Sequence, residues 1–155
     1  LFYIKFMKSK KTNADISLNI QYLKDFSFNN LKAPEIYLYN EIKPKVDISF
    51  DLNATKLKED IYESEIILEL NGRIKDELAF ILKIIYSGIF TIKNVEKSLI
   101  PENLFIDCPT ILFPFLRQIV ATTTRDANLP PIMLDAVDFE EVYESKKDSI
   151  ENIKK

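Results

Sequence analysis

The stretch LAFILKIIYSGIF, residues 78–90, predicts a strand that is apolar on both faces. One face would carry Leu78, Phe80, Leu82, Ile84 and Tyr86, and the other would carry Ala79, Ile81 and Ile85 with a single charge, Lys83. A strand that is apolar on both faces has to be covered on both. Helices of the same chain can cover one face. We expect a second subunit to cover the other.

Three further segments have the alternation of half-buried strands: ISLNIQYLKDFSF (16–28), where it is broken at Leu23 and Lys24, VDISFDL (46–52) and YESEIILEL (62–70). After the third segment, Asn71-Gly72 predicts a tight turn, with the hairpin loop extending toward Asp76. Short loops between the later segments favour antiparallel pairing. These segments therefore predict an antiparallel sheet.

The pattern becomes helical after Gly88. Residues 101–128 predict a helix or a helix pair, with Pro109 and Pro114 at or near a helix start. Polar residues at 117–118 and 122–125 give this region a polar side, and the sequence NLPP at 128–131 ends it. A second helix is predicted after Asp138, a suitable N-cap residue, with two glutamates in its first turn. The fold class is therefore α+β.

Composition excludes several classes of function. The 155 residues suffice for one domain or one subunit of an assembly. A net charge of -3 argues against nucleic acid as a partner, because phosphate binding requires a basic surface. No run approaches the roughly 20 apolar residues of a membrane span, so we expect no direct membrane insertion. The single cysteine, Cys108, excludes an internal disulfide and fits a reducing, cytosolic compartment.

The residues offer little chemistry. The chain has no histidine, which removes the side chain most used for acid–base work and metal binding near neutral pH. Cys108 stands before a proline in an apolar setting, which is typical of inert packing. Carboxylate pairs such as Glu140/Glu141 and Glu59/Asp60 are typical of a solvated acidic surface, and neither glycine lies in a phosphate-binding loop. We predict no catalytic residue, no metal site, no cofactor and no enzymatic activity.

Three apolar segments outside the predicted helices form a candidate binding surface. They are the loop 36–42, the strand 46–52 and the proline-containing crossover 129–137. Exposed apolar patches of a few hundred Å² usually mark interaction sites. The alternative, that all three segments belong to the core, remains open, because the sequence does not show which side chains are exposed.

Four motifs together resemble the SecB family of bacterial protein-export chaperones. They are YLKDFSFNNLKAPEIY (22–37), SGIFTI (87–92), CPTILFPFLRQIV (108–120) and LPPIMLDAVDFEEVY (129–143), in matching order across residues 16–145. The resemblance implies a four-stranded antiparallel sheet with two helices packed on one face, and a homotetramer built as a dimer of dimers. It also implies ATP-independent holding of unfolded precursor proteins in the bacterial cytoplasm and their delivery to the SecA ATPase.

The resemblance also implies site residues. A groove for unfolded clients would be lined by Ile42, Val46, Ile48, Phe50, Leu134, Val137 and Tyr143. SecA would bind at Asp25 and Ile81, although Asn29 and Lys83 replace neighbouring carboxylates of the family patch. Together with the doubly apolar strand, the family packing predicts a tetramer interface at Leu82, Ile84 and Tyr86.

The predicted organisation has three parts. Residues 1–15 form a disordered or non-native segment, since Met7 followed by KSKK is typical of a translation start. Residues 16–145 form the SecB-like chaperone domain, and residues 146–155 form a C-terminal tail. A second hypothesis from another functional class stays open: a soluble protein that binds a hydrophobic ligand or one dedicated partner through the same groove.

Overall fold

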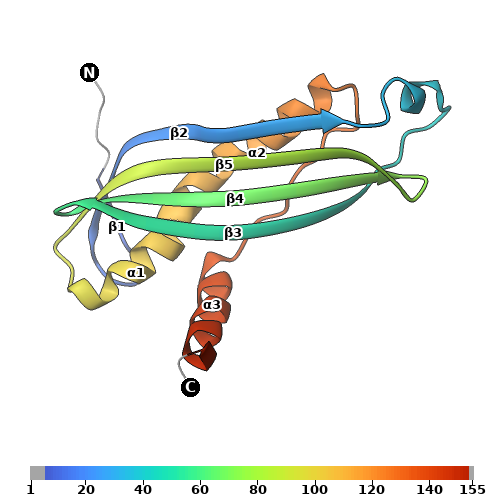
Figure 1. Cartoon of the computed structure of the whole chain (residues 1–155). Coiled ribbons are helices and arrows are strands. Elements are labelled where there is room, and N and C mark those ends of the chain that lie inside the picture. The colour runs from blue at the N-terminus through green and yellow to red at the C-terminus, as the bar shows by residue number, and fades with distance from the viewer. Residues whose placement is uncertain (1–5, 154–155) are drawn as a thin grey trace.

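One antiparallel sheet organises the molecule (Figure 1). The computed structural model describes the backbone of residues 6–153 and the side-chain surroundings of residues 7–147. The strands are β1 (Phe6–Lys8), β2 (Asp15–Asn30), β3 (Lys45–Lys58), β4 (Ile61–Ile74) and β5 (Glu77–Lys93), in the order β1-β2-β5-β4-β3. The antiparallel α+β prediction is confirmed. The strand count differs from the predicted four because a three-residue strand, β1, is added at one edge.

The segment before β2 is built into this edge. Phe6–Lys8 pair with Asp15–Ser17, and the Ser9 N–H donates to the Ala14 carbonyl oxygen at 2.9 Å. Ser9 and Ala14 are both buried. Residues 6–15, which were expected to belong to a disordered or non-native segment, therefore form a strand and a turn in the structure. Residues 1–5 of that segment lie outside the described residues.

The hairpin between β4 and β5 turns later than the strongest local signal predicts. Asn71 and Gly72 lie inside β4, and the turn is made by Lys75 and Asp76, which have φ angles of 52° and 63°. Gly72 pairs with Phe80, whose ring covers it: a Cβ atom at residue 72 would lie 2.0 Å from Phe80 Cζ. The glycine is needed for this close approach and not for a turn, so the tight turn predicted at Asn71-Gly72 is wrong and only its extension toward Asp76 is confirmed.

One long helical region covers one face of the sheet. It runs through a 3-10 turn (Lys97–Leu99), α1 (Ile100–Glu102), a π-helical turn (Asn103–Asp107) and α2 (Cys108–Asp126). Pro109 lies in the first turn of α2 as predicted, but Pro114 lies inside the helix and not near its start. The fully buried stripe of α2 consists of Cys108, Leu112, Leu116 and Val120, which recur every four residues and so share one helix face.

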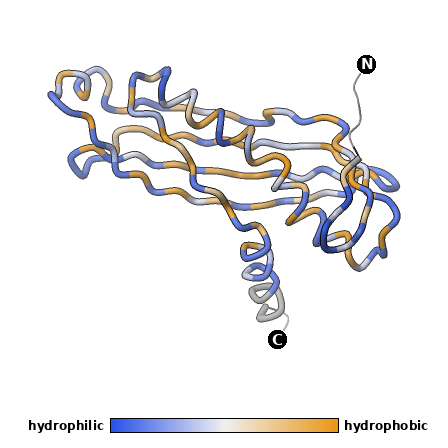
Figure 2. Tube along the Cα trace, turned by 180° about the vertical axis from the view of Figure 1, so that it is seen from behind, coloured by the Kyte–Doolittle hydropathy of each residue, from blue (hydrophilic) through white to orange (hydrophobic). Residues whose placement is uncertain are grey.

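The helical region is longer and more apolar as a unit than the sequence analysis predicted. Residues Lys97–Asp126 are long and apolar enough, by length and composition alone, to cross a membrane. The expectation that no segment reaches this limit is therefore wrong. Packing accounts for part of this hydropathy, because the apolar stripe of α2 lies against β4 and β5. Figure 2 shows hydrophobic residues recurring along the strands and the crossover that follows this helix.

The chain leaves α2 through an irregular crossover, residues 127–138, and ends in α3 (Phe139–Ile153). The predicted N-cap is confirmed, because Asp138 Oδ1 accepts the backbone N–H groups of Glu140 and Glu141 at 3.0 and 3.2 Å. In Figure 1, α3 extends away from the sheet on the side of β3. Residues 146–153, expected to belong to a tail, continue this helix, and residues 154–155 lie outside the described residues.

Candidate binding groove

A shallow pocket lies between β3 and the crossover. Its volume is about 240 Å³, and it is lined by Ile48, Phe50, Leu68, Phe113, Leu134, Asp135, Ala136 and Val137. The strand residues point to this side because even-numbered positions of β3 share the helix-covered face of the sheet. Asp135 carries the one charge of the lining. The pocket therefore offers an almost wholly apolar surface, which we call the β3 groove.

The structure brings together four of the seven predicted groove residues: Ile48, Phe50, Leu134 and Val137. Val46 is half-buried on the same strand but does not line the pocket, and Ile42 packs against the core from the crossing loop. Tyr143 has a different environment. Its ring stacks on that of Phe105, with the centroids 6.0 Å apart.

Three aromatic rings form the support of the β3 groove. The centroid of Phe50 lies 6.5 Å from that of Phe113 and 5.9 Å from that of Phe139, and the last two rings are 5.8 Å apart. These rings come from β3, α2 and α3, so one contact joins three elements that are distant in sequence. Ring pairs at such distances stabilise by about 0.5–1.5 kcal/mol beyond their buried area. The cluster therefore fixes the crossover against the sheet.

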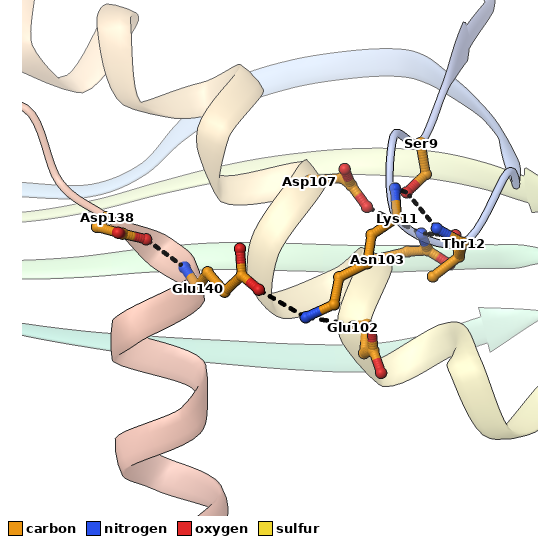
Figure 3. Close-up of polar contacts among 8 residues, drawn as sticks. All are labelled: Ser9, Lys11, Thr12, Glu102, Asn103, Asp107, Asp138 and Glu140. Carbon is orange, nitrogen blue, oxygen red and sulfur yellow. Dashed lines mark hydrogen bonds and ion pairs between the residues drawn. The ribbon is translucent and has the colours of Figure 1, made fainter.

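Polar contacts hold the crossover near its middle and at its end. Near its middle, the Ile132 N–H donates to Thr124 Oγ1 at 3.0 Å. At its end, Lys11 Nζ contacts Glu140 Oε1 at 2.7 Å and Glu102 Oε2 at 3.9 Å (Figure 3). The N-terminal turn, α1 and α3 thus meet around one ammonium group.

The same turn is tied to the π-helical segment. Asn103 is fully buried, and its Nδ2 donates to Thr12 Oγ1 at 2.7 Å and to Asp107 Oδ2 at 2.9 Å (Figure 3). The N-terminal segment therefore takes part in positioning α3 and the adjoining wall of the β3 groove.

The sequence did not predict a second, larger hollow on the other side of the crossover. Its volume is about 830 Å³, and its lining combines polar residues of α2 with apolar residues of the crossover: Thr110, Phe113, Pro114, Arg117, Gln118, Ala121, Thr122, Arg125, Pro131, Met133, Ala136, Val137 and Phe139. The polar side of the helix was visible in the sequence. Its meeting with the crossover was not, because irregular chain carries no period from which its path can be predicted.

The face of the sheet away from the helices carries the residues predicted to bind SecA. Asp25 is exposed on β2 opposite Ile85, and Ile81 is half-buried opposite Asn29. Lys83 Nζ lies 3.3 Å from Glu69 Oε2 on the neighbouring strand. The lysine that replaces a family carboxylate is therefore accompanied by a carboxylate one strand away.

A partly buried polar cluster occupies the same outer face. Lys24 bridges Glu63 and Glu65, and Glu65 also accepts a hydrogen bond from Asn53 at 2.9 Å. Burial opposes the charge of Glu65, but the contacts from Lys24 and Asn53 outweigh it and hold the pKa of this carboxyl below its ordinary value. Burial and the neighbouring Glu63 raise the pKa of Tyr22 to about 12. Lys24 offsets one of the two carboxylate charges, and the contacts among Tyr22, Lys24, Glu63, Glu65 and Asn53 join β2, β4 and β3, so we assign the cluster a structural role.

The predicted tetramer interface requires correction. Leu82 and Ile84 are at most 1% exposed, and Tyr86 is 7% exposed with its ring stacked on Phe115 of α2. These side chains lie on the face that the chain covers with its own helix. Leu82 and Ile84 therefore offer no accessible side-chain surface within this chain, while Tyr86 lines a shallow pocket beside Phe115. Ile81, Ile85 and Ile89 of β5 remain partly accessible and lie on the opposite face.

The next feature is the set of groups that could carry catalytic chemistry, namely the cysteine and the possible metal ligands. Cys108 is fully buried, as predicted, and burial raises the pKa of its thiol well above the ordinary value. Within residues 7–147, no three side chains of the ligand-forming types are grouped to hold a metal ion. What the described surface offers is apolar grooves beside the crossover.

Comparisons with known proteins agree with this geometry. Residues 9–149 match the family model SecB, described as preprotein translocase subunit SecB. The chain is 36% identical over 128 residues to the protein-export protein SecB of Zymomonas mobilis, covering 83% of this chain and 77% of that protein. It is 37% identical over 138 residues to the protein-export protein SecB of Rickettsia felis, covering 88% of this chain and 91% of that protein.

A solved structure supports the fold. The Mycobacterium tuberculosis Rv1957 SecB-like chaperone, in complex with a ChAD peptide from the Rv1956 HigA1 antitoxin, superposes with a TM-score of 0.64 at 15% identity, covering 79% of this chain and 87% of that chain. At that identity, the likeness concerns the fold alone. The match of the family model to most of the chain and the sequence identity to the curated relatives decide the family: this chain belongs to the SecB family.

Proposed function

We propose that this protein is an ATP-independent chaperone that holds unfolded precursor proteins and delivers them to the SecA ATPase for export. The β3 groove carries the proposal, since it offers an apolar lining beside an edge strand in a chain of the SecB family. Relatives named as protein-export proteins support the role in export. The SecB-like chaperone of similar fold, whose structure includes a bound peptide, supports polypeptides as the ligands.

The lining of the β3 groove favours broad recognition of apolar segments. Ile48, Phe50 and Val137 have no hydrogen-bonding side-chain groups, so they discriminate weakly among apolar sequences. Binding of this kind needs no nucleotide. It buries apolar surface and gives a negative heat-capacity change.

Delivery to SecA would use the outer face of the sheet. The proposed contacts are Asp25 and Ile81, and they would attract a basic segment of the ATPase. Lys83 reduces this attraction, while Glu69 at 3.3 Å offsets part of the reduction. We expect docking that is weaker than with the family's usual carboxylate at this position but not abolished.

The proposed assembly is a homotetramer, a dimer of dimers, in the bacterial cytoplasm. Because Leu82, Ile84 and Tyr86 lie under α2, we expect the subunit contacts to use other surfaces. The accessible apolar residues Ile20, Leu23 and Phe26 of β2 are available for such a contact. Light scattering on the unmodified chain tests the assembly, and a monomer at micromolar concentration would contradict it.

The decisive experiment measures suppression of aggregation without nucleotide. Several unrelated chemically unfolded proteins are diluted into buffer with and without the chain. We expect protection of all of them. Ile48→Asp should abolish most of this protection, because it places a charge in the β3 groove. Ser49→Asp, on the opposite face of the same strand, is the matched control and should retain it.

Protection of none of these proteins, together with tight binding of a single small apolar molecule or one folded partner, would instead support the second hypothesis of a dedicated binder. Protection that Ile48→Asp leaves intact would move the site away from the β3 groove.

A further inference from the structure

One end of the sheet is basic in an otherwise acidic chain. It consists of residues 8–15, the β3–β4 turn at 56–60 and residues 93–97 at the end of β5, which lie together at the left of Figure 1. Seven lysines and four carboxylates give these segments a net charge of +3, which leaves -6 for the rest of a chain whose total is -3. We call this region the basic end. A charge asymmetry of this kind is typical of proteins that meet an anionic partner.

The other elements of the chain neutralise little of this charge. Lys11 is paired with Glu140 of α3 at 2.7 Å. Among the described residues, the other six lysines of the basic end form no ion pair with a carboxylate outside it. Most of the excess positive charge is therefore available to a partner.

The strand register brings the lysines of different strands close together. Lys8 of β1 pairs with Asp15 of β2, and Asp15 pairs with Lys93 of β5, so two lysines flank one carboxylate. Neighbouring strands lie about 4.8 Å apart, which places Lys58, at the end of β3, two strands or roughly 10 Å from β5. The lysines therefore form one surface.

A pocket of about 340 Å³ lies within the basic end. Three lysines, from β3, β5 and the following 3-10 turn, line it: Lys56, Lys93 and Lys97. Two carboxylates also line it, but Glu59 pairs with Lys56 at 3.4 Å, which leaves Asp60 alone against Lys93 and Lys97. Among the described residues, no ion pair or hydrogen bond engages the side chains of Lys93 and Lys97. The pocket therefore keeps an excess of positive charge.

Exposed apolar side chains lie among these charges. Leu57, between Lys56 and Lys58 in the β3–β4 turn, is 45% exposed, and a register shift between these two lysines leaves it unpaired with β4. Met7, next to Lys8 on β1, is also 45% exposed. Proteins that bind membrane surfaces combine lysines at the headgroup phosphates with apolar side chains at the acyl boundary. The basic end offers both.

A nucleic acid fits the basic end less well. Its three segments contain no arginine and no aromatic residue, the side chains that read base edges and stack on bases. A sugar–phosphate backbone also offers no apolar layer to Leu57 and Met7. A phospholipid surface offers phosphates with an apolar layer beneath them, so it accommodates both kinds of side chain.

We propose that the basic end binds the surface of a membrane that contains anionic phospholipid, with Lys58, Lys93 and Lys97 at the phosphates and Leu57 at the acyl boundary. The binding is peripheral and reversible, because each lysine near an anionic surface strengthens partitioning only about fivefold. The inference goes beyond the proposed export role and does not depend on client binding. Phe50 of the β3 groove lies roughly 24 Å from Leu57 along β3, so the groove stays accessible on a membrane.

Co-sedimentation with vesicles tests the proposal. Vesicles of phosphatidylethanolamine and phosphatidylglycerol should retain the protein at low salt, and vesicles of zwitterionic phosphatidylcholine should not. Salt at about 0.5 M should release the protein, since the screening length then falls to about 4 Å. Equal retention by the two kinds of vesicle, or retention by neither, would overturn the proposal.

Charge-matched variants locate the contact. The triple variant Lys58→Gln/Lys93→Gln/Lys97→Gln should lower the partition coefficient on anionic vesicles at least about 20-fold. The control is Lys43→Gln/Lys45→Gln/Lys75→Gln, which removes three exposed lysines at the opposite end of the sheet. It should lower the coefficient less than about threefold, because charges that far from the contact are screened. Equal losses in the two variants would show attraction without a specific surface and overturn the proposal.

A fluorescent reporter tests the position of Leu57. Cys108 is fully buried, so Leu57→Cys supplies the accessible thiol for an environment-sensitive nitrobenzoxadiazole dye. Emission from residue 57 should shift to the blue on anionic vesicles, and emission from the same dye in Lys43→Cys should not. Bound protein with no shift at residue 57, or with an equal shift at residue 43, would overturn the proposed orientation.

Soluble anions provide the remaining controls. Neither inorganic phosphate nor glycerol phosphate at millimolar concentration should displace the protein from anionic vesicles. Displacement accompanied by calorimetric binding of either anion would identify a site for a free phosphate and overturn the membrane proposal. Tighter binding to single-stranded RNA than to anionic vesicles at the same salt concentration would identify a nucleic acid as the partner and overturn it as well.

Discussion

The two faces of β5 use similar residues and experience different environments. On the helix-covered face, Phe80, Leu82 and Ile84 are at most 1% exposed, because α2 lies over them. On the outer face, Ile81 and Ile85 are half-buried and flank Lys83, whose side chain is 54% exposed. The comparison teaches that alternation identifies which residues share a face but not which face the chain covers by itself.

The largest expected effect is the difference between charges placed on these two faces. Ile84→Asp should destabilise the protein by at least about 4 kcal/mol, since it buries an unpaired carboxylate under α2. Ile85→Asp, its neighbour on the outer face, should cost less than about 1 kcal/mol. Urea denaturation followed by circular dichroism measures both. Equal losses would show that a second subunit also covers the outer face.

The next effect is a steric one on the helix-covered face. Gly72→Ala should cost about 1–3 kcal/mol, because the new methyl group overlaps the Phe80 ring. Asn71→Ala, one residue away on the outer face, should cost about 0.5 kcal/mol or less. Adding Phe80→Leu to Gly72→Ala should recover part of the loss, and the coupling is measured by a double-mutant cycle. Full additivity would show that the ring moves aside.

A smaller effect is expected from charges on the outer face. Lys83→Glu should lower stability by about 0.2–1 kcal/mol at low salt, since it breaks an exposed pair and sets two glutamates opposite each other. The exchange Lys83→Glu/Glu69→Lys should restore it. In the proposed docking to SecA, Lys83→Glu should strengthen binding to a basic segment of the ATPase, more at low salt than at high salt. Binding unchanged by both Lys83→Glu and Asp25→Ala would place docking elsewhere.

The smallest expected effect concerns the ion pair between Asp51 and Lys146 at the free edge of β3. Lys146 holds the pKa of Asp51 below its ordinary value of 3.8, with the Leu52 N–H acting in the same direction. Because the folded-state pKa of Asp51 is the lower one, ionised Asp51 stabilises the folded protein. This contribution is complete above pH 3.8 and is lost as the pH falls through the folded-state pKa. Nuclear magnetic resonance titration of the Leu52 amide should show a midpoint below 3.8. Lys146→Met should raise it, and an unchanged midpoint would mean that the ion pair is absent in solution.

Several local signals were sufficient for the elements they define. The alternation of 46–52 placed Val46, Ile48 and Phe50 on one face, and Asp138 marked the start of α3, because both depend on neighbours a few residues away. Other local signals were overruled by distant contacts. Asn71-Gly72 has turn chemistry, yet the Phe80 ring requires a glycine inside the strand. Pro114 favours a helix start, yet α2 continues through it.

By itself, the sequence determined the antiparallel α+β class, the family, the absence of histidine chemistry and the apolar character of the crossover, since these follow from composition, period and motif order. Only the tertiary structure decided that α2 covers Leu82 and Ile84, that Tyr143 packs on Phe105 instead of lining the β3 groove, and that Lys146 caps the edge at Leu52. Each of these joins residues separated by tens of positions. Such contacts depend on how the faces of different elements meet, and the period of any one element specifies its own faces but not their partners.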